Sequence, residues 1–190
     1  MAKFIALDVE SGGTDPKTTS LLTASFMVLD DKYFMLDELN LLLKPNDGIY
    51  RAKMSAMEVN RIDLTEHDKK AMTYSEGGAK LRDFLYKHSG GGQDKLIPLG
   101  KNVNFDIGYI NEQLLNSNTW NQFVSYRFYD LTSIIMFAKR IGLLNPNAPE
   151  GLQKLAAHLD LQFDTRAHDA RSDVMMTIDI IKGFEEAAKY

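Results

Sequence analysis

Three apolar segments rich in β-compatible residues open the chain, and their order constrains the fold more than any other feature of the sequence. They cover residues 3–9, 20–29 and 33–43. The second and third are separated by Asp30-Asp31-Lys32, a polar break suited to a hairpin. Helical patterns then alternate with short apolar segments over the rest of the chain. This order predicts an α/β fold with three layers, in which a mixed central β-sheet is flanked by helices.

The later elements are placed by hydrophobic period and by turn residues. We expect short strands over 96–99 and 127–129, and helices over 55–61, 75–88, 102–115, 131–141, 152–159 and 170–186. The sequence has no internal repeat, no low-complexity segment and no linker-like stretch. Its 190 residues are therefore expected to form a single domain, residues 1–190.

The composition excludes several classes of protein. The chain has no cysteine, which excludes a disulfide framework, thiolate zinc sites, iron–sulfur clusters and a cysteine nucleophile. Its formal net charge of −4 argues against a protein that binds duplex DNA mainly by neutralising phosphates. No apolar run approaches the ~20 residues that span a bilayer, and Asp8 comes too early for a signal peptide. We expect a soluble, cytoplasmic protein without a membrane partner.

Two carboxylates, Asp8 and Glu10, end the first apolar segment. Residues i and i+2 share one face of a strand, so both side chains should project from the same side near its end. Adjacent like charges beside apolar residues repel each other unless a cation bridges them. The alternative is that the strand has simply ended and both carboxylates face water.

Two further acidic clusters follow. Asp106 ends the segment Gly100-Lys101-Asn102-Val103-Asn104-Phe105-Asp106, where a short strand leads into a helix. The carboxyl end of a strand in an open sheet is a common place for a ligand site, although Asp106 could be an ordinary residue of a helix N-terminus. His168 and Asp173 are five residues apart, so both can face one point only if His168 lies on the loop before the helix. Otherwise His168 is a capping or surface histidine, and Asp173 is a solvated helix residue.

Together the three clusters predict one site. Four carboxylates could hold two hard divalent cations, which take oxygen ligands: Asp8, Glu10, Asp106 and Asp173. A nearby histidine, His168, could accept a proton from a water that attacks a phosphodiester. Two cations would stabilise the attacking and the leaving oxygens of such an in-line displacement.

With these residues in place, the chain resembles the DnaQ-like (DEDDh) 3′–5′ exonucleases, which have a ribonuclease-H-like fold. The family's first motif, Asp-x-Glu followed by small or hydroxyl residues and Gly, is similar to residues 8–13. Its second motif, a Gly-His-Asn-type turn leading into Phe-Asp, is similar to residues 100–106, and its third, His-x4-Asp, to residues 168–173. The sister branch has Tyr-x3-Asp instead, and that slot is Asp169 here. The resemblance covers most of the chain.

The resemblance implies a role for each matching residue. The four carboxylates would bind two Mg²⁺ or Mn²⁺ ions, and His168 would be the general base. Contacts to the substrate are implied for two residues of the first motif, one in a helical segment beside the terminal base and two in the second motif: Ser11, Gly12, Asn60, Asn102 and Phe105.

Two departures from the family pattern bear on substrate preference. Lys101 replaces the histidine that is common in the second motif, and Ser11-Gly12-Gly13 replaces a threonine-rich turn. Lys101 lies beside the expected site and could hold a phosphate or simply face solvent. Asp169 could share a helix face with the third-motif aspartate and is its main rival as a ligand. His67 and His88 are expected to be surface histidines.

These expectations lead to a metal-dependent exonuclease that shortens single-stranded nucleic acid from the 3′ end and releases nucleoside 5′-monophosphates. DNA is favoured over RNA by the likeness of residues 105–110 to proofreading subunits, which also suggests DNA repair or proofreading, with a DNA polymerase or replication protein as a partner. The alternatives are a small exoribonuclease resembling oligoribonuclease, a ribonuclease-H-type endonuclease, and a non-catalytic nuclease-like partner of the replication machinery.

Overall fold

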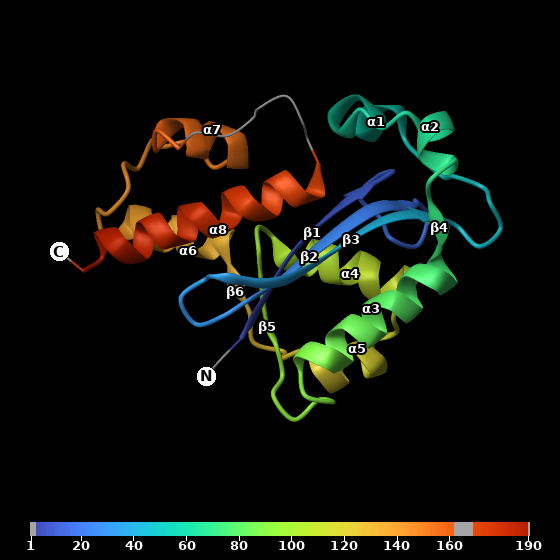
Figure 1. The fold of residues 1–190 in the computed structure, drawn as a ribbon. Coiled ribbons are helices and arrows are strands. Elements are labelled where there is room, and N and C mark those ends of the chain that lie inside the picture. Colours follow the sequence, from blue (N-terminus) through green and yellow to red (C-terminus); the bar gives the residue numbers. More distant parts are fainter. Residues whose placement is uncertain (1–2, 162–168, 190) are drawn as a thin grey trace.

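The computed structural model describes residues 3–161 and 169–189 and is built around a six-stranded sheet (Figure 1). The strands are β1 (Phe4–Ser11), β2 (Leu21–Leu29), β3 (Met35–Lys44), β4 (Met72–Thr73), β5 (Ile97–Gly100) and β6 (Tyr129–Asp130). Their order across the sheet is β4-β3-β2-β1-β5-β6. The β1–β2 and β2–β3 pairs are antiparallel, whereas β3–β4, β1–β5 and β5–β6 are parallel. The expected mixed sheet is confirmed.

Strand β1 is buried on both faces, and its alternate residues enter two different cores. Phe4 and Ala6 pack into one core, while Ile5, Leu7 and Val9 pack into the other. This division follows from the two-residue period of a strand. The sheet is therefore the middle of three layers, as the sequence predicts.

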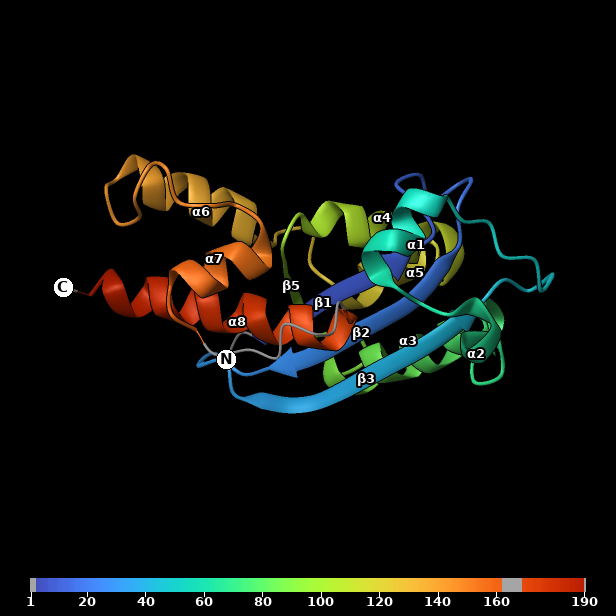
Figure 2. The same cartoon turned by 90° about the horizontal axis from the view of Figure 1, so that it is seen from above.

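Helices α6 (Leu131–Arg140), α7 (Leu152–His158) and α8 (Ala170–Ala187) form the layer over Phe4 and Ala6. Figure 2 shows α6 and α7 lying beside α8. In α8, Val174, Ile178 and Ile181 are buried in this core, at the i, i+4, i+7 spacing of an amphipathic helix.

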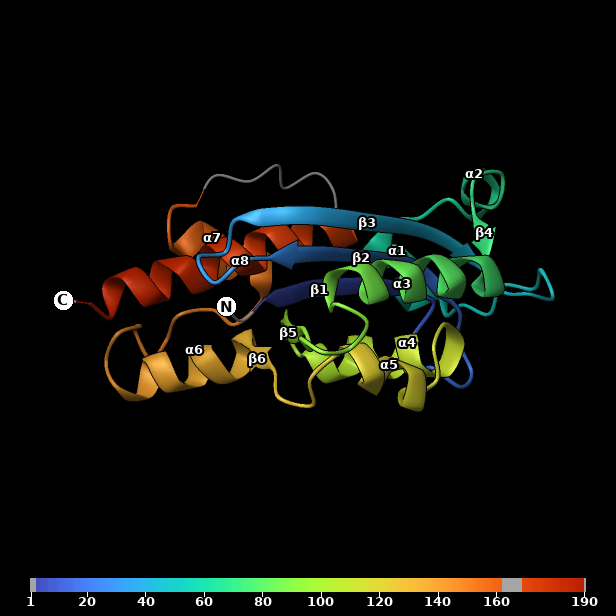
Figure 3. The same ribbon diagram turned by 60° about the horizontal axis from the view of Figure 1, so that its bottom comes forward.

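Helices α3 (Tyr74–His88), α4 (Val103–Gln113) and α5 (Ser117–Phe123) form the opposite layer (Figures 1 and 3). Helix α3 begins with a capping box, in which Thr73 and Glu76 bond each other's backbone N–H groups. Leu81 and Leu85 of α3 and Trp120 of α5 are almost completely buried in this layer.

Two short helices, α1 (Met54–Asn60) and α2 (Leu64–Asp68), lie between β3 and β4. Every helix and strand expected from the sequence is present, with ends that differ by at most two residues from the expected ranges. The sequence did not predict α2, β4 and α5. The first two have only 5 and 2 residues, too few to show a hydrophobic period.

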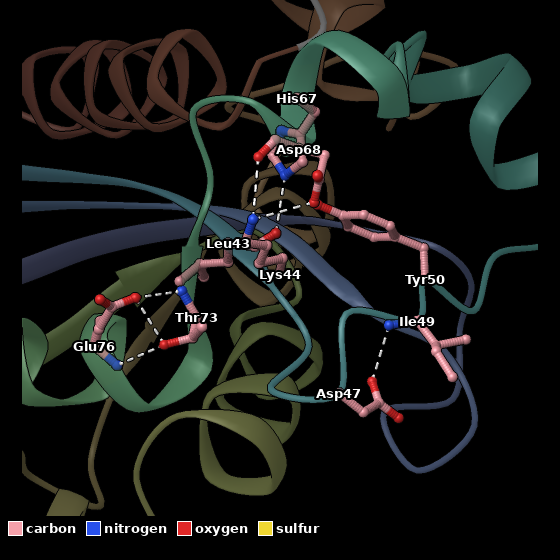
Figure 4. Close-up of polar contacts among 9 residues, drawn as sticks. All are labelled: Leu43, Lys44, Asp47, Ile49, Tyr50, His67, Asp68, Thr73 and Glu76. Atoms are coloured by element: carbon pink, nitrogen blue, oxygen red, sulfur yellow. Dashed lines mark hydrogen bonds and ion pairs between the residues drawn. The ribbon is translucent and has the colours of Figure 1, made fainter.

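The prediction that His67 is a surface histidine is wrong. Its side chain lies against the end of β3, and the residue is only 7% exposed, with Nε2 2.9 Å from the carbonyl oxygen of Leu43 (Figure 4). The neighbouring Asp68 accepts hydrogen bonds from Lys44 and from the Tyr50 hydroxyl, which fixes α2 against the end of β3. The lysines that follow His67 in the sequence gave the polar pattern, whereas the fold turns this one side chain inward.

The expectation for His88 is also wrong. Its side chain is 11% exposed, and Nε2 lies 2.9 Å from Oδ2 of Asp37 on β3. Lys87 approaches the same oxygen at 2.7 Å. These two contacts lower the pKa of Asp37 to about 2.

None of the helices in residues 3–161 and 169–189 combines the length and the apolar character needed to cross a membrane.

Candidate metal centre and nucleotide site

Three carboxylates from two distant parts of the chain meet at one edge of the sheet. Asp8 and Glu10 come from β1, and Asp173 comes from the first turn of α8. One oxygen of each lies within 4.8 Å of an oxygen of the other two. All three side chains are partly buried.

The strand and the helix that meet here are placed by the core below the site. Asp8 and Glu10 continue the face of β1 that carries Phe4 and Ala6, and this face is covered by α8. The apolar alternation thus ends in two carboxylates directed at the helix start. The β1–β2 register shifts between Glu10 and Ser11, so the regular ladder ends beside the site.

Asp169 fixes the beginning of α8 and is not one of the clustered carboxylates. Its backbone is extended (φ −130°, ψ 142°), and its side chain accepts hydrogen bonds from the backbone N–H and the hydroxyl of Ser172. This is an ordinary N-cap, which satisfies a backbone donor of the first turn. Asp169 therefore positions Asp173 through the helix that it caps.

Asp106 approaches the cluster from α4. It is 3% exposed, and its Oδ1 accepts a hydrogen bond of 3.0 Å from the backbone N–H of Val9, between Asp8 and Glu10. The hydrogen bond spans 97 residues of sequence. It holds Asp106 against β1, beside the three clustered carboxylates but not among them.

Burial and neighbouring carboxylates raise the pKa values of the carboxyl groups in the site. Burial first, and then the charges of Asp106, Asp173 and Glu10, raise the pKa of Asp8 well above its usual range, against an opposing effect of Lys101. Burial, together with Asp173 and Asp169, raises the pKa of Glu10 to about 7.

The pKa of Asp106 rises to about 8, chiefly because of burial, although the Val9 N–H lowers it. Within residues 3–161 and 169–189, no positive group of matching strength offsets the raised pKa values of these carboxyl groups.

The donor set fits a hard divalent cation. Carboxylate oxygens from Asp8, Glu10 and Asp173 converge within one coordination sphere's reach, and Asp106 lies beside them. A cation that binds here displaces protons and offsets the mutual repulsion of the carboxylates.

A hollow of about 500 Å³ opens beside Glu10, and we call it the Glu10 hollow. Its lining includes three of the residues expected to contact substrate: Ser11, Asn60 and Phe105. Asn60 is buried, and its amide donates to the carbonyl oxygen of Ser11 at 3.1 Å. The Ser11 hydroxyl donates to the carbonyl oxygen of Gly13 at 2.7 Å. The first bond holds α1 against the end of β1, and the second closes the turn that follows β1.

Gly12 and Asn102 do not line the Glu10 hollow. Gly12 has a packing role, because a Cβ there would lie 2.5 Å from the carbonyl oxygen of Arg51. Asn102 caps α4 in the left-handed conformation (φ 57°) with an exposed side chain, and its backbone N–H donates to Asp130 at 3.2 Å. His168, the expected general base, lies outside the described residues.

The sequence reasoning missed a second hollow, of about 410 Å³, which we call the Asp173 hollow. It is lined by Asp173 and by residues 150–154, at the start of α7. Glu150 and Lys154 are its charged residues besides Asp173. No motif signals them, because only the packing of α7 against α8 brings them to the site.

The layers, strand order and acidic edge define a ribonuclease-H-like α/β fold, and the expected fold of the DnaQ-like exonucleases is confirmed. Solved structures of exonuclease I share this fold. Neither a protein-family model nor a curated protein sequence matches this chain.

Escherichia coli exonuclease I in complex with a dT13 oligonucleotide has a TM-score of 0.77 at 20% identity, covering 100% of this chain and 42% of that chain. The zinc-bound E. coli exonuclease I complex with single-stranded DNA has a TM-score of 0.78 at 20% identity, covering 96% and 40%. A moderately thermophilic exonuclease I from Methylocaldum szegediense has a TM-score of 0.78 at 16% identity, covering 98% and 41%. This chain thus spans about two fifths of the length of the solved chains that it resembles.

Proposed function

We propose that this chain is a metal-dependent 3′–5′ exonuclease that acts on single-stranded DNA and releases nucleoside 5′-monophosphates. The observation that carries the proposal is the convergence of Asp8, Glu10 and Asp173 within 4.8 Å, beside the buried Asp106. The bound oligonucleotide in one structural neighbour, and the zinc ion and single-stranded DNA in another, favour the same chemistry and favour DNA over RNA.

In this proposal each part of the site has a task. Asp8, Glu10, Asp106 and Asp173 hold two Mg²⁺ or Mn²⁺ ions, which when bound stabilise the attacking and leaving oxygens of an in-line displacement. His168 takes the proton of the attacking water. The water oxygen bonds to phosphorus as the bond between phosphorus and the 3′ oxygen of the preceding nucleotide breaks. That oxygen takes a proton from solvent and leaves as the 3′ hydroxyl of the shortened strand.

The Glu10 hollow is proposed to take the terminal nucleotide. Its volume of about 500 Å³ is in the range of small-ligand sites. Phe105 offers an aromatic ring for stacking, and Asn60 and Ser11 hold its walls.

The test uses 5′-labelled single-stranded DNA and RNA of matched sequence, each with Mg²⁺, with Mn²⁺ or with chelator. We expect a metal-dependent ladder that shortens from the 3′ end, faster for DNA. Asp8→Asn should abolish it, while Asp83→Asn, an exposed aspartate on α3, should cleave like the parent.

Each of the other outcomes would indicate a different function or refute the metal centre. Internal fragments would indicate an endonuclease, and faster RNA cleavage an exoribonuclease. Cleavage by Asp8→Asn equal to that of the parent would refute the metal centre. Retention of single-stranded DNA without cleavage under any metal would indicate a non-catalytic partner of the replication machinery.

A further inference from the structure

Lys101 lies beside the carboxylate cluster. It directly follows β5, whose Leu99 pairs with Ala6 of β1, so Lys101 and Asp8 each come two residues after a paired position on adjacent parallel strands. Its charge reaches Asp8, because it opposes the rise of that residue's pKa. The lysine therefore lies at the same edge of the sheet as the carboxylates.

Two other basic residues near the site already have partners. Lys139 pairs with Glu150 at 2.8 Å, and Arg171 pairs with Glu38 at 2.9 Å. Within the part of the chain that the structure describes, the Lys101 ammonium makes no ion pair and no hydrogen bond with any side chain. Its side chain is partly exposed. Lys101 thus keeps an uncommitted positive charge next to a negatively charged site.

Lys101 lies on one particular side of the carboxylates. Besides Asp8, its charge acts on Glu150, whose pKa is lowered mainly by Lys139 and to a smaller extent by Lys101. Glu150 lines the Asp173 hollow, on the wall formed by residues 150–154. Lys101 does not line the Glu10 hollow, and it follows β5, which neighbours β1 on the side away from β2. Figure 2 shows α7, whose start lines the Asp173 hollow, on this same side of α8.

We propose that Lys101 binds a backbone phosphate of the retained strand, the phosphate on the 5′ side of the penultimate nucleotide. This inference rests on the proposed function, which puts the terminal nucleotide in the Glu10 hollow and the scissile phosphate at the carboxylates. The next nucleotide then continues to the other side of the carboxylates, where Lys101 and the Asp173 hollow lie. An ammonium there supplies a point charge for the phosphate among groups that otherwise repel it.

A simple screening role for Lys101 gives a different result. If the lysine only reduced repulsion among the carboxylates, its removal would alter cation affinity and stability. The affinity for an oligonucleotide would then be equally sensitive to every phosphate of the strand. A direct contact, by contrast, depends on the charge of one phosphate.

The test is a cycle that combines a protein variant with a substrate change. Lys101→Met is compared with the parent on single-stranded DNA that carries either a natural phosphate or a neutral methylphosphonate on the 5′ side of the penultimate nucleotide. Binding is measured by fluorescence anisotropy with Ca²⁺, and cleavage with Mg²⁺. Lys32→Met, at the β2–β3 hairpin beyond the opposite end of β1, is the matched control.

Each single change should weaken binding and raise KM by about tenfold, with a smaller effect on kcat. The two changes together should weaken binding no more than either change alone. The slope of log affinity against log salt should fall by about 0.7 in Lys101→Met and stay unchanged in Lys32→Met. Lys101→Arg should recover most of the affinity.

Additive losses, or a methylphosphonate that affects the parent equally at all positions, would overturn the phosphate contact. If the parent binds DNA and the two changes weaken binding non-additively, but the parent cleaves nothing, the phosphate contact stands and the exonuclease proposal fails. If the parent cleaves and Lys101→Met behaves like Lys32→Met, the exonuclease stands and the contact fails. No binding of single-stranded DNA by the parent would overturn both.

Discussion

At the scale of single residues, the site is defined by side chains that are unfavourable where they stand. Asp8, Glu10 and Asp106 have raised pKa values because burial and mutual repulsion oppose their ionised forms. Asp106 carries a second task, since its Oδ1 satisfies the N–H of Val9. Charge and hydrogen bond can be separated by substitution, because asparagine keeps the acceptor and loses the charge.

Asp106→Asn should therefore abolish cleavage while leaving the free energy of unfolding equal to or above that of the parent. Asp106→Leu should lose cleavage and also cost about 1–3 kcal/mol, because the buried N–H of Val9 loses its acceptor. Urea denaturation in chelator, beside the oligonucleotide ladder, measures both. An Asp106→Asn variant that cleaves at the parental rate would remove this residue from the site.

At the scale of elements, two helix starts bring functional groups to the end of β1. Helix α8 starts at the Asp169 cap and presents Asp173 in its first turn. Helix α4 starts at the left-handed Asn102 and presents Asp106. The start of α8 has an ordinary side-chain cap, whereas Asn102 begins α4 without one, and both starts meet the same strand.

The cap and ligand roles of Asp169 can be told apart by two substitutions. Asp169→Asn keeps the side-chain acceptor, so we expect stability within a few tenths of a kcal/mol of the parent and nearly full cleavage. Asp169→Ala should cost about 0.5–2 kcal/mol and reduce cleavage through misplacement of Asp173. Thermal unfolding and initial cleavage rates provide the comparison. Loss of cleavage in Asp169→Asn with unchanged stability would instead make Asp169 a ligand.

At the scale of the whole molecule, the carboxylate edge makes stability depend on pH. The folded pKa is about 7 for Glu10 against an ordinary 4.5, and about 8 for Asp106 against 3.8. Between the ordinary and the folded values, the unfolded chain releases its proton while the folded chain retains it. Rising pH therefore favours unfolding in this window.

In chelator, we expect the free energy of unfolding to fall as the pH rises from about 4.5 to 8. Each pH unit contributes at most about 1.4 kcal/mol for each group that titrates only in the unfolded chain. Glu10→Gln should flatten the profile between pH 4.5 and 7, whereas Glu58→Gln, an exposed control on α1, should not. Added Mg²⁺ or Mn²⁺ should restore stability most at the upper end of this pH range. Thermal denaturation across this pH range measures the change. The same dependence of stability on pH in the parent and in Glu10→Gln would contradict the role of Glu10.

The sequence by itself determined the order of the elements and the chemistry available at the site. Apolar periods placed the strands, and alternation in β1 put Asp8 and Glu10 on one face. Motif spacing then added Asp106 and Asp173 as candidates. These are local signals, carried by residues close together in the chain.

Only the tertiary structure decided which distant groups meet. The bond from Asp106 to the Val9 N–H, the inward side of His67, the capping role of Asp169 and the Asp173 hollow all depend on packing between separate elements. A side chain's neighbours across the core are set by how sheet and helices pack, and local periodicity does not encode that contact. The sequence thus identified the carboxylates, and the fold brought them together and left Lys101 uncommitted beside them.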